Sequence, residues 1–442
     1  MERKVKTILA VAIVAVVVVC SAFYYSQLTN PDLETRARDF VNFLRSEESE
    51  KAYSLFNNQM AEAISLEDLR TIWSELEDRV GSYKGIVATK TETEMGYRVI
   101  YVTTEFEETE LDIKVVFDSE AKIAGLWFIE FYSPPEYADP DSFTEVELVI
   151  GSEEWALPAT LTLPNGEGPF PAVILVHGSG PNDRDETIGP NKPFKDLAWG
   201  LATRSIAVLR YEKRTKEHSE KVAEILENFT VNDETVDDAL AAAKVLLEQS
   251  KISPNRISVL GHSLGGMLAP RIGISNETIA GLIILAGNTR DLQDLLLDQA
   301  QYLALLDGKI DDAESKQLEE IEEGARKIRE LDIGEGEIVF GASRAYWEDL
   351  SQYDPVETAK ELDIRILILQ GERDYQVTME DFQGWNSSLH SYENVEFKVY
   401  PTLNHLFIEG EGKSTPNEYF QAGNIAEIVM RDIASWIENQ SA

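Results

Sequence analysis

The sequence is short of cysteine, of histidine and of positive charge. Its one cysteine, Cys20, excludes an intrachain disulfide framework. Its 40 Lys and Arg residues stand against 79 Asp and Glu residues, for a formal net charge of −39. Nucleic acid and anionic membrane surfaces are therefore not expected as partners, because binding to phosphate groups needs positive charge. The sequence has no zinc-ligand spacing, no Walker sequence and no dinucleotide-binding fingerprint, so no metal and no cofactor is expected.

The amino-terminal segment carries the longest apolar run. Three basic residues precede it: Arg3, Lys4 and Lys6. Residues 8–25 are apolar except for Ser21, which as a helix is long enough to cross the roughly 30 Å hydrocarbon core of a bilayer. No Lys or Arg follows until Arg36, so residues 1–28 are predicted to anchor the chain in the cell membrane as a single span, with the remainder outside the cytoplasm. The alternative is a signal segment that is cleaved at the small residues 20–22, which would leave a secreted protein.

Residues 31–133 are predicted to form a small α+β accessory domain. Residues 32–57 have a helical apolar pattern, and Ser65 with Asp68 forms a capping-box sequence that opens a second helix to about residue 79. Four strand-like runs follow, at residues 83–89, 97–106, 111–117 and 123–131. Helices followed by a meander of this kind predict one antiparallel sheet.

Residues 134–142, with repeated prolines and no apolar period, are interpreted as a linker to a catalytic domain at residues 143–442. That domain opens with a predicted hairpin, 143–150 and 155–163. Six short apolar runs then alternate with helical segments, at residues 172–176, 206–209, 257–260, 279–285, 364–369 and 395–399. Continuous apolar strands alternating with helices predict an α/β fold, with a mostly parallel sheet covered on both faces.

The sequence Gly261-His-Ser-Leu-Gly265 directly follows one of these strands and precedes a helical segment. In a strand–turn–helix context this pattern predicts a nucleophile elbow, which lifts the Ser263 hydroxyl above the sheet. The N–H group of Leu264 then lies at a helix N-terminus, where it can stabilise an oxyanion. A second oxyanion donor is expected in the loop after strand 172–176, with the backbone of Ser179 preferred over that of Gly180.

A serine nucleophile needs a base, and the base needs an acid that orients it. Of five histidines, only His405 follows the last predicted strand, where a loop returns over the carboxyl edge of the sheet. Asp374 follows strand 364–369 and is the predicted acid; Glu372, in the same loop, is the alternative. The order Ser263, Asp374, His405 is the one expected for this type of elbow.

Between strands 279–285 and 364–369 the chain runs for almost eighty residues, far more than a crossover needs. The helical, acidic part at about residues 288–350 is interpreted as a cap over the active-site edge, which either lines the acyl pocket or only buries the mouth of the domain. Two aromatic residues near its end, Tyr346 and Trp347, are candidates for selecting the acyl chain of a substrate.

Residues from about 143 onward resemble the α/β-hydrolase superfamily, particularly its dienelactone-hydrolase and prolyl-oligopeptidase-like carboxylesterases. The resemblance rests on the block 177–185 (His-Gly-Ser-Gly-Pro-Asn-Asp-Arg-Asp), on the elbow 261–265 and on the loop 371–374 (Gly-Glu-Arg-Asp). Relatives often carry a small domain of unknown function ahead of the hydrolase, and residues 31–133 are similar to it. Where relatives tend to have Arg-Tyr-Asp-x-Arg, this chain has Arg210-Tyr-Glu-Lys-Arg214, so no role is carried over to Glu212.

The resemblance implies hydrolysis of short to medium acyl esters of small molecules through an acyl-enzyme intermediate. A serine peptidase or an acyl thioesterase would use the same three residues on another leaving group. A binding protein with an inactive site is a more remote alternative. The oligomeric state is not predicted by any feature of the sequence.

Overall fold

The computed structural model of this protein describes residues 33–439 apart from positions 95, 108 and 152. The predicted anchor at residues 1–28 lies outside this range. Within it, no helix combines the length and the apolar composition that crossing a membrane requires. The chain divides into two compact units, the first of which holds the residues up to Tyr132 together with Gly189–Asn191 and Pro416–Ala422.

The first unit packs four helices against one face of an antiparallel sheet. The helices are α2 (Leu33–Arg45), α3 (Ser49–Tyr53), α4 (Asn58–Ala63) and α5 (Leu66–Val80). The strands pair in chain order, β1 (Tyr83–Glu94), β2 (Tyr97–Phe106), β3 (Glu110–Phe117) and β4 (Ile123–Glu130). Inward-facing residues alternate along β3, and they share one core with Phe40 of α2 and Trp73 of α5. The predicted capping box is present, with Ser65 and Asp68 bonding reciprocally at the start of α5.

One expectation for this unit was wrong in detail. The helical pattern of residues 32–57 is split into α2 and α3, because the chain turns between them. Glu47 takes a positive φ of 57° there, which a continuous right-handed helix cannot contain.

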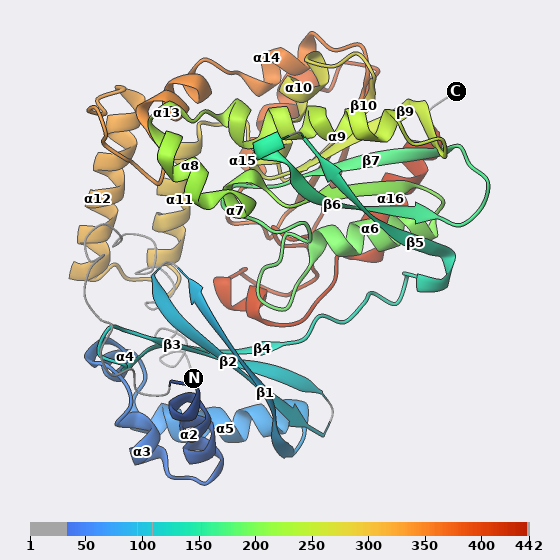
Figure 1. The fold of residues 1–442 in the computed structure, drawn as a ribbon. Helices are drawn as coiled ribbons and strands as arrows, with labels where there is room; N and C mark the ends of the chain where they lie inside the picture. Colours follow the sequence, from blue (N-terminus) through green and yellow to red (C-terminus); the bar gives the residue numbers. More distant parts are fainter. Residues whose placement is uncertain (1–32, 95, 108, 152, 440–442) are drawn as a thin grey trace. The chain divides into compact units, whose positions relative to one another are not determined.

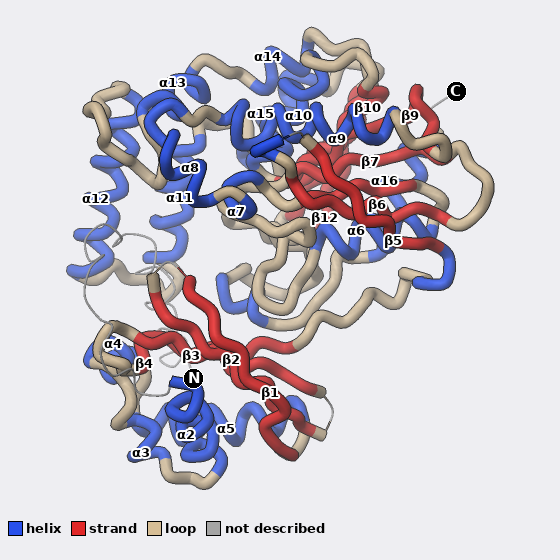
Figure 2. The backbone as a smooth tube through the Cα atoms, in the orientation of Figure 1, coloured by secondary structure: helices blue, strands red, loops and turns tan. Residues whose placement is uncertain are grey.

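The second unit is built on an eight-stranded sheet (Figures 1 and 2). The strands are β5 (Phe143–Ile150), β6 (Leu157–Pro164), β7 (Phe170–Val176), β8 (Ala207–Tyr211), β9 (Ile252–His262), β10 (Ile279–Leu285), β11 (Arg365–Gly371) and β12 (Val395–Tyr400). Their spatial order is β12-β11-β10-β9-β7-β8-β6-β5. The sheet is parallel from β12 to β8, and β6 is antiparallel to both β5 and β8.

Helices cover both faces of this sheet, and an apolar core lies between the helices and the sheet on each side. On one face, α9 (Asp237–Leu247), α10 (Leu264–Ile274) and α15 (Met379–Leu389) cover one set of strand side chains. On the other face, α6 (Pro193–Thr203) and α16 (Glu427–Glu438) cover the alternate set. Burial on both sides explains why β10 and residues 366–369 of β11 are continuously apolar in sequence.

The long insertion between β10 and β11 is helical, as expected. It contains α11 (Leu292–Ala304), α12 (Asp312–Arg329) and α13 (Arg344–Ser351), and α14 (Pro355–Lys360) follows before the strand resumes (Figure 1). The acidic N-terminus of α12 has a second capping box, in which Asp311 and Glu314 bond reciprocally. The apolar sides of α12 and α13 share a cluster with the first turn of α10, so the insertion is packed on the helix that follows the elbow.

Candidate active site

Ser263 occupies the sharp turn between β9 and α10. Its backbone has φ 54° and ψ −118°, a strained conformation for a residue with a side chain. Two flanking glycines make the turn possible. A Cβ on Gly261 would lie 2.1 Å from the carbonyl oxygen of Gly265, and a Cβ on Gly265 would lie 2.3 Å from that of Val176. The predicted strand–turn–helix context of Ser263 is therefore present, and no larger residue fits at either glycine.

Asp374 and His405 form a buried pair above the carboxyl ends of β11 and β12. His405 Nδ1 lies 2.7 Å from Asp374 Oδ2, and their side chains are 5% and 0% exposed. The other carboxylate oxygen accepts the backbone N–H groups of Gln376 and Val377, at 2.8 and 3.0 Å. These bonds fix the carboxylate in the orientation that holds the imidazole. Glu372, the alternative acid, is exposed.

The histidine loop is tied to the elbow through His262. The rings of His262 and His405 have centroids 4.6 Å apart, and His262 Nε2 lies 3.0 Å from the backbone carbonyl oxygen of His405. Asn404 stabilises the loop from within, because its side-chain oxygen accepts the N–H groups of Leu406 and Ile408. His405 is thus held beside the residue that precedes Ser263.

The loop after β7 runs against the nucleophile. A Cβ on Gly178 would lie 3.2 Å from Ser263 Cβ, so this glycine is in close contact with the serine. Ser179, whose N–H is a predicted oxyanion donor, is the next residue along, and Leu264 is the first residue of α10. The two predicted donors therefore come from segments that meet at Ser263.

Two charged residues that the sequence did not single out, Glu186 and Lys213, contact the loop after β7. Glu186 Oε1 accepts the N–H of Gly178 at 2.7 Å, while Glu186 Oε2 lies 2.9 Å from His262 Nδ1. Burial alone would lower the pKa of His262, but Glu186 raises it. The charge of His262 in turn holds the pKa of Glu186 low against desolvation. Lys213 donates to the carbonyl oxygen of Gly178 at 2.6 Å.

The positions of Glu186 and Lys213 in the sequence could have indicated that they lie near the active site. Glu186 and Lys213 lie in the segments that follow β7 and β8, and the carboxyl ends of parallel strands share one edge of the sheet. His177, the first residue after β7, is also buried, between Phe194 and Tyr211. Desolvation lowers the pKa of His177 to about 4, so this imidazole is neutral at physiological pH.

The structure also shows the surroundings of Tyr346, Trp347 and Glu212. Tyr346 and Trp347 do not face a substrate space, because they are 7% and 2% exposed within the cluster beneath the insertion. Glu212 bonds Arg184, with 2.7 Å between Oε1 and Nε. Among the residues that the structure describes, no group of three or more His, Cys, Asp or Glu side chains is arranged to hold a metal ion.

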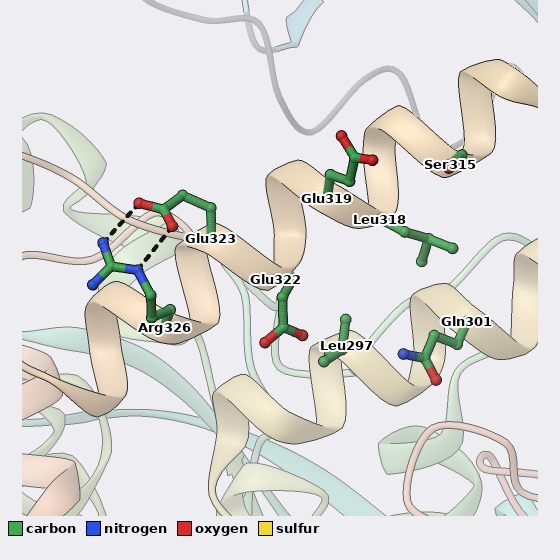
Figure 3. Close-up of a pocket in the computed structure, with 8 residues that line it drawn as sticks. All are labelled: Leu297, Gln301, Ser315, Leu318, Glu319, Glu322, Glu323 and Arg326. Atoms are coloured by element: carbon green, nitrogen blue, oxygen red, sulfur yellow. Dashed lines mark hydrogen bonds and ion pairs between the residues drawn. The ribbon is translucent and has the colours of Figure 1, made fainter.

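A pocket of about 440 Å³ opens between α11 and α12 (Figure 3). Leu297 and Gln301 of α11 face Leu318 and Glu322 of α12 across it, and Arg326 pairs with Glu323 at one end. A second pocket, of about 580 Å³, lies between α13 and the 226–228 turn. Neither pocket is lined by Ser263, Asp374 or His405.

The strand order and the positions of the three residues, after β9, β11 and β12, define an α/β-hydrolase with a serine nucleophile elbow. Comparison with known proteins agrees with this class. Residues 37–126 match the model of a protein family of unknown function, DUF3887, and residues 213–279 match the prolyl oligopeptidase family. The small domain of unknown function that the resemblance implied is therefore confirmed.

The esterase EstD of Thermotoga maritima is 40% identical to this chain over 402 residues, which cover 90% of this chain and 93% of that protein. The chain belongs to the EstD esterase family. Among solved structures, Est1E from Butyrivibrio proteoclasticus has 16% identity and a TM-score of 0.42, covering 66% of this chain and 98% of its own. An acylaminoacyl peptidase from Pyrococcus horikoshii has 15% identity and a TM-score of 0.47, covering 80% and 50%.

Proposed function

We propose that this chain hydrolyses carboxylic esters of small molecules with Ser263 as nucleophile, His405 as base and Asp374 as the acid that orients the base. The enzyme is a serine carboxylesterase. The observation that carries the assignment of roles is the buried 2.7 Å contact between His405 Nδ1 and Asp374 Oδ2. That contact keeps the proton on Nδ1 and leaves Nε2 free to accept one from the serine.

The reaction follows from these positions. Ser263 Oγ attacks the ester carbonyl as His405 Nε2 takes its proton, and Asp374 stabilises the imidazolium that forms. The N–H groups of Leu264 and Ser179 stabilise the oxyanion of the tetrahedral intermediate. His405 returns the proton to the leaving alcohol, which leaves an acyl group on Ser263 Oγ. Water then attacks the acyl carbonyl as His405 takes its proton, and the carboxylic acid departs as His405 gives that proton to Ser263 Oγ. Acyl groups of short to medium length are the proposed substrates.

A peptidase activity is the second candidate, because residues 213–279 match the prolyl oligopeptidase family. The same triad would then release an amine in place of an alcohol, and a thioesterase would release a thiol. Parallel assays with p-nitrophenyl acyl esters, acyl thioesters and peptide p-nitroanilides separate the three. Turnover of the esters at a kcat/KM at least 100-fold above that of the anilides is the expected result.

The proposed location is the cell membrane, with the catalytic unit outside the cytoplasm. The support is the apolar run at residues 8–25 and its basic flank. Full-length protein is expected to sediment with membranes, whereas a variant that begins at Thr29 is expected to stay in the supernatant. Mature chains that begin near Ala22 would show a cleaved signal in place of an anchor.

The nucleophile is tested by Ser263→Ala, with the exposed Ser387→Ala of α15 as the matched control. Esterase activity is expected to fall by about 10⁴-fold or more in S263A, because triad members act as a unit. A fluorophosphonate probe should label the wild type and S387A but not S263A. Labelling or turnover by a folded, pure S263A protein would refute the assignment.

A further inference from the structure

Lys213 is an ammonium group buried beside the reaction centre. It follows β8 by two residues and is 2% exposed. Its Nζ donates to the carbonyl oxygen of Gly178 at 2.6 Å and lies 2.6 Å from Oε1 of Glu234. Burying such a pair has a desolvation cost that often exceeds the attraction between the charges, so the fold alone does not explain the pair.

The carbonyl that Lys213 contacts belongs to a particular peptide unit. The C=O of Gly178 and the N–H of Ser179 are the two ends of one amide, and the N–H of Ser179 is the second proposed oxyanion donor. A hydrogen bond from a cation to the carbonyl oxygen polarises the amide, which makes its N–H a stronger donor. Such cooperative strengthening is about 10–30% per bond in condensed phases. The same bond also fixes the plane of the peptide.

The preceding peptide is held from the other side. Glu186 Oε1 accepts the N–H of Gly178 at 2.7 Å, so an anion and a cation clamp consecutive peptide units of the loop. The counter-ion of Lys213 is itself held by the insertion. Tyr346 of α13 donates its hydroxyl to Glu234 Oε2 at 2.6 Å, in a buried contact.

We propose that Lys213 is a positioning residue that orients and polarises the Gly178–Ser179 peptide as an oxyanion donor, with Glu234 and Tyr346 holding its ammonium group in place. The inference rests on the proposed function, because it takes Ser179 N–H as part of the oxyanion hole. The proposal assigns a role to Lys213 within the sequence Arg210–Arg214. It also gives α13 of the insertion a role, because Tyr346 holds the counter-ion of Lys213.

Lys213→Met tests the proposal, because methionine fills similar space without a charge or a donor. The matched control is Lys251→Met, since Lys251 is an exposed lysine that also donates to a glycine carbonyl, that of Gly166, at 2.9 Å. Removing a whole oxyanion donor costs about 10²–10³ in kcat. Because K213M keeps the Ser179 N–H, kcat should fall by about 10- to 100-fold, with KM within about threefold. K251M should stay within twofold on both constants.

Inhibitor binding separates positioning from general disruption. A boronic acid that forms a tetrahedral adduct on Ser263 should lose as much affinity in K213M as kcat/KM loses. An uncharged amide analogue of the substrate, which forms no oxyanion, should bind the wild type and K213M equally. Equal losses for both inhibitors, or an unchanged kcat in folded K213M, would overturn the proposal.

Tyr346→Phe provides the second variant if K213M does not fold. It removes only the hydroxyl that holds Glu234, so kcat should fall severalfold with KM unchanged, and an unaltered kcat would count against the role of the insertion. These outcomes are distinct from a failure of the proposed esterase function. In that case the wild type itself would lack esterase turnover and would not react with the fluorophosphonate.

Discussion

Tyr302 of α11 stacks on Tyr375, the residue that follows Asp374, with ring centroids 4.9 Å apart and planes 6° apart. A second contact joins the same segments, because Gln299 donates to the backbone carbonyl oxygen of Gln376 at 3.0 Å. The insertion therefore packs directly on the loop that carries Asp374, the proposed catalytic acid. If the insertion selects substrates, these contacts would link selection to the position of Asp374.

We expect Tyr302→Leu to change acyl-chain preference more than reactivity. An aromatic pair contributes about 0.5–1.5 kcal/mol beyond its buried area, enough to let α11 shift when it is lost. The kcat/KM for a long acyl ester should fall by about tenfold, and that for p-nitrophenyl acetate by less than threefold. Tyr302→Phe is the control, since it keeps the ring and removes only the hydroxyl bond to Ser414. Equal losses on both esters would show that α11 does not select substrates.

Asp374→Asn should reduce kcat by about 10⁴-fold, because an amide in place of the carboxylate favours the wrong tautomer of His405. Glu372→Gln should change kcat by less than threefold, since Glu372 is exposed. Steady-state kinetics on one activated ester compares the two variants directly. The opposite ranking would make Glu372 the acid.

His177 should make the fold sensitive to acid. Burial lowers the pKa of His177 from 6.5 to about 4, so between these values the unfolded chain binds a proton that the folded chain does not. The stabilisation is complete above pH 6.5 and is lost as pH falls to about 4. At about 1.4 kcal/mol per pH unit, the free energy of unfolding should fall by about 3 kcal/mol from this group.

The measurement is urea unfolding of the wild type and of His177→Gln between pH 7 and pH 4. The variant should lose about 3 kcal/mol less than the wild type over this range. His390→Gln, at an exposed histidine of the surface, should follow the wild type. Identical pH profiles for all three proteins would show that His177 does not couple folding to protonation.

Local patterns determined much of this molecule. The elbow at Ser263 is recognisable because strand, tight turn and helix adjoin in sequence. Gly261 is required by a contact within the turn, and Gly265 by a contact with the neighbouring strand β7. The capping box of Ser65 and Asp68 is likewise complete within four positions. The alternation of apolar runs and helices predicted the parallel sheet, because burial on both faces leaves a continuous apolar signal in each strand.

Only the tertiary structure shows which of several neighbouring candidate residues takes part in the site. Asp374 and Glu372 follow the same strand two residues apart, and only the turn that directs N–H groups of Gln376 and Val377 onto Asp374 points it at His405. Lys213, Glu234 and Gly178 meet from three distant segments, and no periodicity links them. The burial of Tyr346, which the sequence suggested would face a substrate, follows from how α13 packs on α10. Contacts of this kind depend on the path of the whole chain, whereas a sequence pattern records only the near neighbours of each residue.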